Sequence, residues 1–295
     1  IILNFNHMNN IKYLYAFLVI FMFSCEEVIE LDLNDGQQRL VIDAGINWEK
    51  GTDGKNQEIK LTLSSPYYQN ETLPASGANV QIINSNNDIF NFNEINNTGL
   101  YTTSTFNPVL NESYTLEIEY KGQIYSGSET LIPASEIDRV EQTNDTGFTG
   151  EDIEIKAFLK DLDTPGVENY YLFEEYFIRK DEYIYGVGDD QFVDGSNNQV
   201  FSVNFYNSDT LRTGDKLRLK NLGCSKRYYQ FMFLLLSQTA DGAGGPFSTT
   251  PATVRGNIVN KSDEDNYPFG FFRLSETDTV EYTVTEDGGS QEYNE

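Results

Sequence analysis

The first half of the chain is divided into short strand-like runs, and this division constrains the fold more than any other feature of the sequence. Along Ser113–Tyr120 apolar and polar residues alternate, which is the pattern of a strand with one buried face. Turn residues separate the runs. Seven short strands without a helical period predict an immunoglobulin-like β-sandwich over residues 40–132. The predicted strands are Leu40–Trp48, Glu58–Ser64, Ala78–Asn84, Ile89–Asn93, Leu100–Ser104, Ser113–Tyr120 and Gln123–Leu131.

The second half, residues 133–284, predicts a further β-rich α+β domain with one buried helix. Ser225 is a candidate N-cap, and apolar side chains occupy almost every side of the segment that follows. We therefore expect a helix near 225–239 that is buried nearly all round. The polar residues 285–295 are expected to form a disordered tail. The strands predicted in this half are Glu151–Lys160, Asn169–Arg179, Gln199–Tyr206, Val254–Val259, Phe269–Leu274 and Val280–Val284.

The N-terminal residues have the features of an export signal. Met8 is the candidate initiator, a lysine follows it, and the apolar run Tyr13–Phe23 is too short to span a bilayer. A serine and a cysteine come next, as in a bacterial lipobox. Residues 1–24 therefore predict a lipoprotein signal peptide, and Cys25 predicts the lipidated first residue of the mature chain. Residues 25–39 would form an acidic tether. The alternative is an uncleaved signal anchor in which the cysteine is incidental.

Composition excludes several classes of function. The chain has 46 acidic and 20 basic side chains, and its net charge of −26 excludes a nucleic-acid-binding protein, which needs clustered Lys and Arg. Cleavage before Cys25 removes the only histidine, His7. A mature chain without histidine cannot use Ser-His-Asp or Cys-His catalysis, or a histidine-ligated metal. We expect no catalytic residues and no cofactor, and we interpret Cys224 as an inert thiol beside the predicted helix.

A set of short motifs extends along nearly the whole mature chain. The motifs are Cys25-Glu26-Glu27, Ser76-Gly77-Ala78-Asn79-Val80, Gly99-Leu100-Tyr101, Asp163-Thr164-Pro165-Gly166, Asn169-Tyr170-Tyr171, Tyr228-Tyr229, Gly245-Pro246-Phe247, Gly256-Asn257-Ile258 and Gly270-Phe271-Phe272. In this order and spacing they resemble a Bacteroidota lipoprotein family that is known as domain of unknown function 4249. The resemblance implies no established activity. It implies an outer-membrane lipoprotein, often encoded beside TonB-dependent receptors, and hence an accessory to nutrient uptake.

One oxygen-rich loop is the nearest approach to a metal site. Asp189, Asp190 and Asp194 crowd a Gly-rich segment, and hard oxygen ligands in a loop suit Ca²⁺. The loop lacks the regular ligand spacing of an EF-hand. We therefore expect no metal site there and interpret the segment as a solvated acidic loop.

Aromatic residues on one predicted strand are candidates for ligand contact. Tyr170 and Tyr176 fall on one face of this strand, whereas Tyr171, Phe173 and Phe177 fall on the other. Exposed tyrosine rings can stack on a sugar or on a peptide backbone. The alternative is that one set fills the core while the other covers a neighbouring strand, and we favour the core for the face that bears phenylalanine.

Two threonines are candidates for modification. Thr210 and Thr279 both follow an aspartate and precede an apolar residue, a pattern at which some Bacteroidota O-glycosylate exported proteins. Such three-residue patterns also occur by chance.

These observations predict a non-enzymatic lipoprotein of the outer membrane that faces the cell surface. We expect it to bind a small molecule, a glycan or a peptide, and to assist a TonB-dependent receptor in nutrient uptake. The alternative is a structural or adhesive surface protein without a role in transport. An enzyme that uses only carboxylates is a third, disfavoured class.

Overall fold

A computed structural model describes residues 38–65, 72–146, 152–160, 162, 166–191, 200–206, 211–239 and 254–293 of the chain. The described residues are mainly β, with 57% strand and one helix, which confirms the predicted class. The predicted signal peptide 1–24, Cys25 and the tether up to residue 37 lie outside the described residues. Within the described part of the chain, no helix has the length and apolar character needed to cross a membrane.

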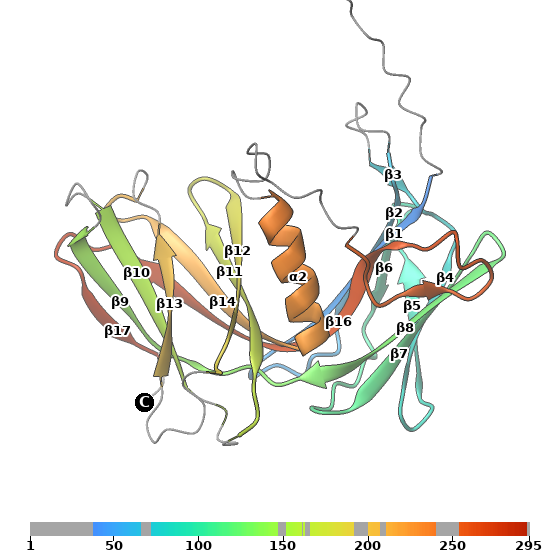
Figure 1. Cartoon of the computed structure of the whole chain (residues 1–295), viewed down its shortest axis with the longest axis horizontal. Coiled ribbons are helices and arrows are strands. Elements are labelled where there is room, and N and C mark those ends of the chain that lie inside the picture. Colours follow the sequence, from blue (N-terminus) through green and yellow to red (C-terminus); the bar gives the residue numbers. More distant parts are fainter. Residues whose placement is uncertain are drawn as a thin grey trace, which may run out of the picture. The chain divides into compact units, whose positions relative to one another are not determined.

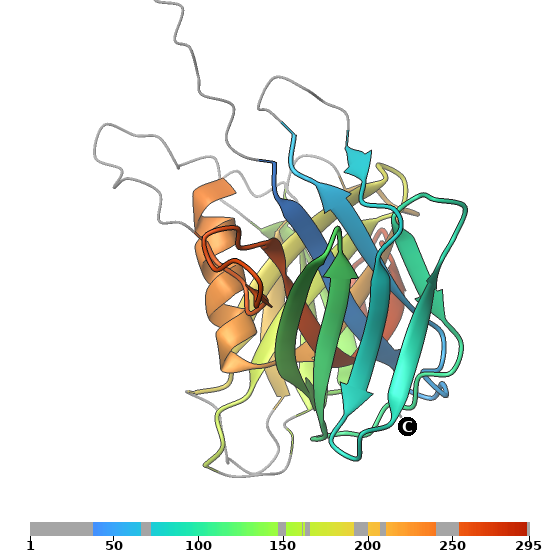
Figure 2. The same cartoon turned by 90° about the vertical axis from the view of Figure 1, so that its right-hand side faces the viewer.

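Eight strands close into a ring around the first hydrophobic core. They are β1 (Leu40–Glu49), β2 (Gln57–Leu63), β4 (Asn79–Asn84), β5 (Ile89–Glu94), β6 (Leu100–Thr103), β7 (Ser113–Tyr120), β8 (Gln123–Ile132) and β16 (Phe269–Thr283). The first seven pair in the order β1-β2-β6-β5-β4-β7-β8, and β16 closes the ring by pairing with both β1 and β8 (Figure 1). Figure 2 shows these strands side by side. Two short strands, β3 (Leu73–Pro74) and β15 (Val259–Asn260), pair with β2 and β8.

Alternate residues of each ring strand fill this core, as the sequence pattern predicts. In β7 the buried residues are Tyr114, Leu116 and Ile118, whose neighbours along the strand face outward. Phe272 and Leu274 of β16 enter the same core. Each fully buried side chain of this size contributes about 1.5–3 kcal/mol of hydrophobic stabilisation. The first half of the chain therefore shares its core with the C-terminal strand and does not fill it alone.

The second half consists of two sheets that pack face to face. Its strands are β9 (Ile137–Thr146), β10 (Asp152–Lys160), β11 (Tyr170–Phe177), β12 (Glu182–Asp189), β13 (Val200–Tyr206), β14 (Lys216–Cys224) and β17 (Gly289–Glu292). One sheet continues the ring strand β16 through β14 and β11 to β12, and the other has the order β13-β10-β9-β17. Side chains from both sheets form the second core, among them Val140, Ile155, Phe173 and Leu217.

A single long strand, β16, joins the two cores. The prediction of separate strands at Phe269–Leu274 and Val280–Val284 is wrong, because the polar residues between them continue the strand. They look like a turn in the sequence, yet their side chains have partners: Glu276 accepts hydrogen bonds from Lys50 Nζ and Ala134 N. The predicted domains 40–132 and 133–284 thus share one sheet, with β8 ending at Ile132 and β9 beginning at Ile137.

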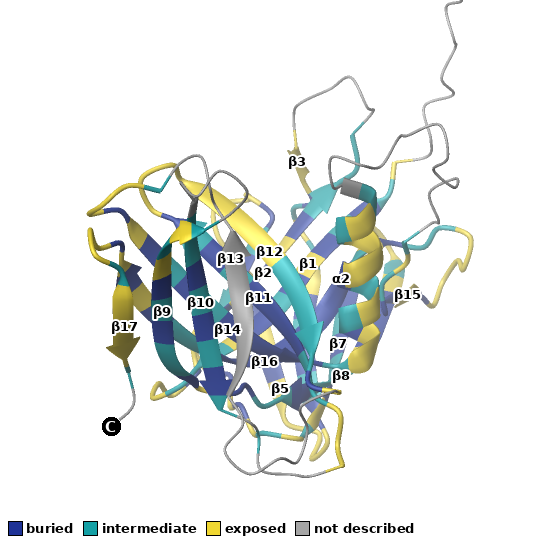
Figure 3. Cartoon of the chain, turned by 60° about the vertical axis from the view of Figure 1, so that its left-hand side comes forward, coloured by how far each residue is buried: buried dark blue, intermediate teal, exposed yellow. Residues whose placement is uncertain are grey.

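The helix α2 (Lys226–Thr239) lies where the sequence predicts it, but it is not buried nearly all round. Its first turn is capped as predicted, since Ser225 Oγ accepts a hydrogen bond from Tyr228 N at 3.2 Å. Tyr228 and Met232 pack on β11, β14 and β16, whereas Phe233 is 56% exposed and Leu234 is 42% exposed (Figure 3). The helix covers the sheet with one face only, so its other apolar residues remain accessible.

Four further strands and the C-terminal end differ from the prediction. β3, β9, β12 and β14 are not among the predicted strands: β3 has only two residues, β9 and β12 lack a clean alternation, and β14 alternates only over Lys216–Lys220 before its continuously buried end. The segment predicted to be a disordered tail contains β17, which pairs with β9. Tyr293 fastens it further, since its hydroxyl donates to Glu281 O at 2.8 Å. The strand predicted at Val254–Val259 is reduced to the two residues of β15.

Candidate functional site

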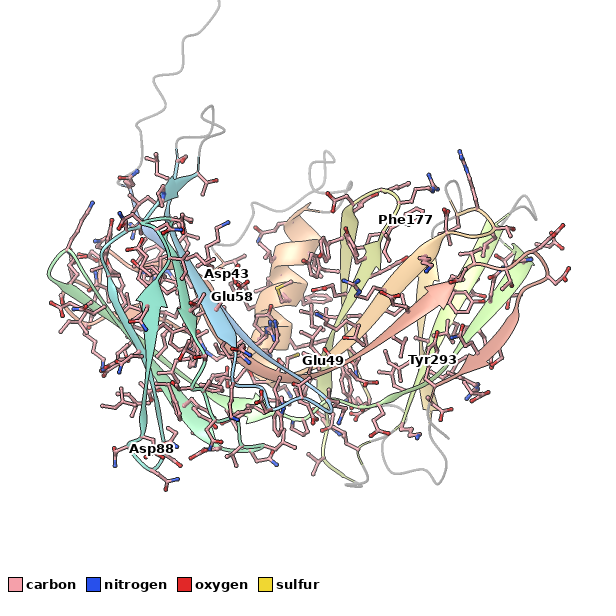
Figure 4. All side chains as sticks on the ribbon, turned by 180° about the vertical axis from the view of Figure 1, so that it is seen from behind. Asp43, Glu49, Glu58, Asp88, Phe177 and Tyr293 are labelled. Carbon is pink, nitrogen blue, oxygen red and sulfur yellow. The ribbon has the colours of Figure 1, made fainter. Side chains whose placement is uncertain are left out.

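A polar groove crosses the outer face of the ring beside α2. It has a volume of about 930 Å³ and lies over β1, β2, β5 and β6. Because the even-numbered residues of β1 fill the core, Asp43, Gly45 and Asn47 point outward. Register then places Asp43 directly opposite Lys60 of β2. Figure 4 shows Asp43 and Glu58 close to the helix. We refer to six of the lining residues as the groove set: Asp43, Asn47, Glu58, Lys60, Asn91 and Asn93.

Gln57 holds the two strands at one end of the groove. Its side chain is buried, and Nε2 donates to both Asn47 O and Gly54 O at 2.8 Å. Its Oε1 accepts from Asn47 N at 3.1 Å. Buried side-chain amides that satisfy several backbone groups rigidify their surroundings. This end of the groove is therefore preformed.

The side chains of the groove set have no partner within the described part of the chain. None of the six makes a side-chain hydrogen bond or an ion pair with a described residue. The outer face of β4, β7 and β8 is different, because its polar side chains pair across strands. Gln81 Nε2 donates to Glu117 Oε2 at 3.0 Å, and the hydroxyls of Thr115 and Ser128 are 2.9 Å apart. The charged and amide side chains of the groove set are thus unpaired among the described residues, whereas polar side chains on β4, β7 and β8 are hydrogen-bonded to one another.

Arg273 lies on the outer face of β16 and lines the groove from below. The residue is only 8% exposed. Its Cζ is 5.4 Å from the centre of the Tyr228 ring on α2, and Nη1 is buried without a hydrogen-bond partner among the described residues. No carboxylate of the described residues lies within ion-pair distance. Gly45 lies directly beside Arg273 in the parallel β1–β16 register.

A cluster of three tyrosines lies on β11 and β12, in the second half of the chain. The rings of Tyr176 and Tyr183 stack at 4.4 Å, and Tyr185 follows at 6.2 Å. Tyr183 and Tyr185 are nearly half exposed. Tyr176 hydrogen-bonds the Asp181 carboxylate at 2.8 Å, which raises the pKa of the phenol. Ligand contact by Tyr176 remains a prediction, and the structure adds two exposed rings beside it.

The other predicted contact residue, Tyr170, lies elsewhere on β11. Its ring packs against Tyr229 at 5.1 Å, with Lys226 over its face, and its hydroxyl donates to Glu168. It therefore joins β11 to the start of α2, and it is not part of the cluster that contains Tyr176. The division of the strand into two faces agrees with the prediction. Tyr171, Phe173 and Phe177 all enter the second core.

The acidic loop does not bring its carboxylates together in the described residues. Asp190 is fully buried and accepts from Asn169 N and Nδ2 at 2.7 and 2.8 Å. Asp189 accepts from the Tyr229 hydroxyl at 3.1 Å. Asp194 lies outside the described residues. No group of three or more His, Cys, Asp or Glu side chains in the described ranges is arranged to hold a metal.

The remaining candidates occupy structural positions or fall outside the described residues. Thr279 donates its hydroxyl to Glu49 Oε2 at 2.9 Å, while Thr210 lies outside the described residues. Cys224 is 2% exposed, and burial raises the pKa of its thiol to about 12. A thiol with such a pKa is almost never ionised at neutral pH, which agrees with the inert role predicted for it.

Sequence reasoning missed Arg273, Gly45 and the groove set. Two signals were present: an arginine interrupts the apolar run Phe271–Leu274, and a glycine interrupts the strand pattern of β1. Neither signal reveals that the two residues are neighbours. Their contact depends on parallel pairing between the first and the last long strands of the described chain.

Comparison with known proteins identifies the family and adds no activity. No curated protein matches the chain. Among solved structures, a DUF4785 family protein from Legionella pneumophila subsp. pneumophila matches with 10% identity and a TM-score of 0.22, over 62% of this chain. The match spans about half (52%) of that Legionella protein, and at this TM-score the likeness carries no argument. The family model for the domain of unknown function DUF4249 matches residues 26–281, so this chain belongs to the DUF4249 family.

Proposed function

We propose that this chain is a non-enzymatic binding protein that takes a polar ligand in the groove. Anchored to the outer membrane through Cys25 and facing the cell surface, it would assist a TonB-dependent receptor in nutrient uptake. The observation that carries the proposal is the unpaired groove set, gathered over a groove of about 930 Å³. Ligand sites are concave and use a small number of convergent polar groups to orient what they bind.

The contrast with the adjoining face of the ring, over β4, β7 and β8, supports a binding role. Exposed polar groups are satisfied by water, so an isolated unpaired side chain needs no explanation. Pairing is nevertheless the rule on β4, β7 and β8, where the four side chains Asn79, Gln81, Glu117 and Glu119 form two cross-strand pairs. Six unpaired amide and charged side chains on one concave face can hydrogen-bond a ligand without first breaking internal bonds.

The N-terminal sequence supports the anchor. Tyr13–Phe23 followed by Ser24-Cys25 resembles a lipobox, and a lipoprotein cysteine carries acyl chains that contribute ~0.8 kcal/mol per buried methylene. Metabolic labelling with palmitate in the native host should label the wild type and not Cys25→Ser. Cys224→Ser is the matched control, because it removes the only other cysteine and should leave the label unchanged. Equal labelling of all three proteins would rule out the anchor.

The accessory role is tested by purification from membranes. Detergent extracts of cells that carry a C-terminally tagged chain should yield a TonB-dependent receptor together with the wild type. Recovery of a lone chain would refute the accessory role and favour the alternative, a structural or adhesive surface protein. Protease treatment of intact cells tests the orientation, since a surface-facing protein is digested and one that faces inward is protected.

An immunoglobulin-like β-sandwich arrangement of residues 40–132 belongs to the same proposal. Support comes from the antiparallel pairing of β2, β4, β5, β6, β7 and β8. The parallel pairing of β1 with β16 is an addition to the antiparallel sheets of such a sandwich.

A further inference from the structure

We propose that the groove ligand carries a carboxylate and that Arg273 binds this group. The inference rests on the proposed function, because it requires that the groove binds a ligand at all. It adds the chemical class of the ligand and the residue that selects it.

The first argument is the unpaired charge of Arg273. The side chain is more than nine-tenths buried, and Nη1 has no hydrogen-bond partner among the described residues. Leaving a buried charge without a counter-charge destabilises a folded protein. The Tyr228 side chain faces the guanidinium with its ring and also interacts with it through its hydroxyl, but it is uncharged and compensates only part of this cost. In a chain with 46 acidic side chains, a missing carboxylate partner is not explained by a shortage of acids.

A second unpaired group lies beside the first. Ser275 follows Arg273 on the same face of β16, is fully buried, and its Oγ has no partner among the described residues. In the parallel register Ser275 is adjacent to Asn47, which belongs to the groove set. Two buried hydrogen-bonding groups thus remain unsatisfied along the same outward face, next to the groove.

Gly45 provides the third argument. Its φ angle lies outside the left-handed region, so any L-residue could adopt the local backbone conformation. A Cβ atom at this position would, however, lie 2.7 Å from Arg273 Nη2. Glycine within a strand interior lowers stability and often marks a close approach of another group. The absence of a side chain at residue 45 therefore leaves room for the guanidinium at the floor of the groove.

The charges of the groove favour a carboxylate over a doubly charged anion. Arg273 and Lys60 supply two positive charges, and Asp43 and Glu58 supply two negative ones. These four charges sum to zero, so a singly charged ligand brings the occupied groove to −1, whereas a phosphate dianion would bring it to −2 beside Asp43 and Glu58. The planar guanidinium also matches a planar carboxylate through two parallel hydrogen bonds. The amides of Asn47, Asn91 and Asn93 suit a hydroxylated body such as that of an acidic sugar.

Calorimetric titration with galacturonate and with its methyl ester tests the inference on the purified chain lacking residues 1–24. The ester removes the single negative charge and adds one methyl group. We expect the acid to bind at least tenfold more tightly than the ester. Triglycine and triglycinamide form a second matched pair, which shows whether the carboxylate can come from a peptide. Inorganic phosphate should displace galacturonate only at concentrations far above the Kd of galacturonate.

Two variants examine the guanidinium, each with a matched control. Gly45→Ala should displace the guanidinium and weaken binding of the acid at least tenfold. Gly186→Ala, on β12, should leave binding unchanged, because no atom lies within 4 Å of the Cβ that it adds. Arg273→Met should have the same effect as Gly45→Ala. Arg255→Met should have none, although Arg255 also stacks on a tyrosine, with Cζ 4.0 Å from the Tyr267 ring centre.

Three results would overturn the inference: equal affinity for acid and ester, equal competition by phosphate, or unchanged binding by both Gly45→Ala and Arg273→Met. Absence of binding by every carboxylate probe at 10 mM would also overturn it. The carboxylate assignment can fail while the proposed binding function holds. If acid and ester bind equally and Asn93→Ala weakens both, the groove is a binding site and only the carboxylate assignment falls.

Discussion

The strands β1 and β16 lie side by side, but the two ends of this pair differ. Buried polar side-chain atoms lack partners among the described residues at one end and are hydrogen-bonded at the other. At the groove end, Gly45 and Asn47 lie beside Arg273 and Ser275, whose buried polar atoms have no partner in the described chain. The junction end begins two residues later. There Glu49 accepts hydrogen bonds from the hydroxyls of Thr277 and Thr279 at 2.7 and 2.9 Å.

At the junction end, the carboxylates of β16 join the two halves of the molecule. Glu276 accepts from Lys50 Nζ at 2.9 Å and from Ala134 N at 3.0 Å, and Asp278 accepts from Ile137 N at 2.6 Å. These bonds fasten the segment between β8 and β9 to β16. The comparison teaches that unpaired polar groups are not a general property of this sheet. Along β16 they are confined to the stretch beside the groove, whereas the other two buried unpaired atoms of the described residues, Glu175 Oε1 and Asn221 Oδ1, lie on β11 and β14.

The largest predicted effect concerns Glu175, a buried residue of β11 whose Oε1 has no partner among the described residues. It tests whether an unpaired buried charge lowers the stability of this protein. Burial, and then the nearby Glu182 carboxylate, raise the pKa of Glu175 from 4.5 to about 7. The folded state therefore binds this proton more tightly than the unfolded state. The resulting stabilisation is complete below about pH 4.5 and is lost as the pH rises through about 7.

Glu175→Gln should remove this dependence. At pH 8 the variant is expected to be more stable than the wild type by up to about 3 kcal/mol, and the two should converge near pH 4. Urea denaturation at several pH values measures the difference. If the free energies of unfolding of the two proteins change in parallel with pH, the unpaired carboxyl group does not destabilise the folded state.

A smaller effect is expected at the junction end. Glu276→Ala leaves a buried backbone N–H and Lys50 without their acceptor, and it should lower the free energy of unfolding by about 2 kcal/mol. Glu58→Ala in the groove is the matched change and should stay within about 0.5 kcal/mol of the wild type. The comparison breaks if Glu58→Ala destabilises the protein as much as Glu276→Ala does.

The smallest effect distinguishes two threonines. Thr279→Val removes a hydroxyl bonded to Glu49 and should cost about 1 kcal/mol. Thr102→Val removes a groove hydroxyl that has no described partner, and it should be nearly neutral. Chemical denaturation of both variants alongside the wild type provides the measurement. Similar losses for the two would mean that the groove hydroxyl has a structural role.

Local pattern predicted the ring strands well and the long-range pairings poorly. The runs along β1 and β7 show a clean alternation, and the cap at Ser225 marks the start of α2, so these elements could be placed from sequence. β14 was missed although Lys216–Lys220 alternates, because both faces of its second half are buried and the alternation stops there. The polar stretch 275–279 resembles a turn until the partners Glu49, Lys50 and Ala134 are known.

The candidate site was less predictable than the fold for the same physical reason. Tyr170 and Tyr176 were correctly assigned to one face of β11, but the alternation does not show that Tyr170 packs against α2. The groove set is composed of ordinary polar residues on three strands, β1, β2 and β5. What distinguishes these residues is the absence of partners among the described residues, and that property emerges only once the sheet closes.

The most direct test of the account separates stability from binding in two variants of the same strand. Arg273→Met should melt at the same temperature as the wild type or higher, since it replaces an uncompensated buried charge, and it should bind galacturonate at least tenfold more weakly. Glu276→Ala should melt lower and retain binding. A lower melting temperature for Arg273→Met with binding intact would contradict the account, because it would show that the unpaired arginine belongs to the structure and not to the ligand.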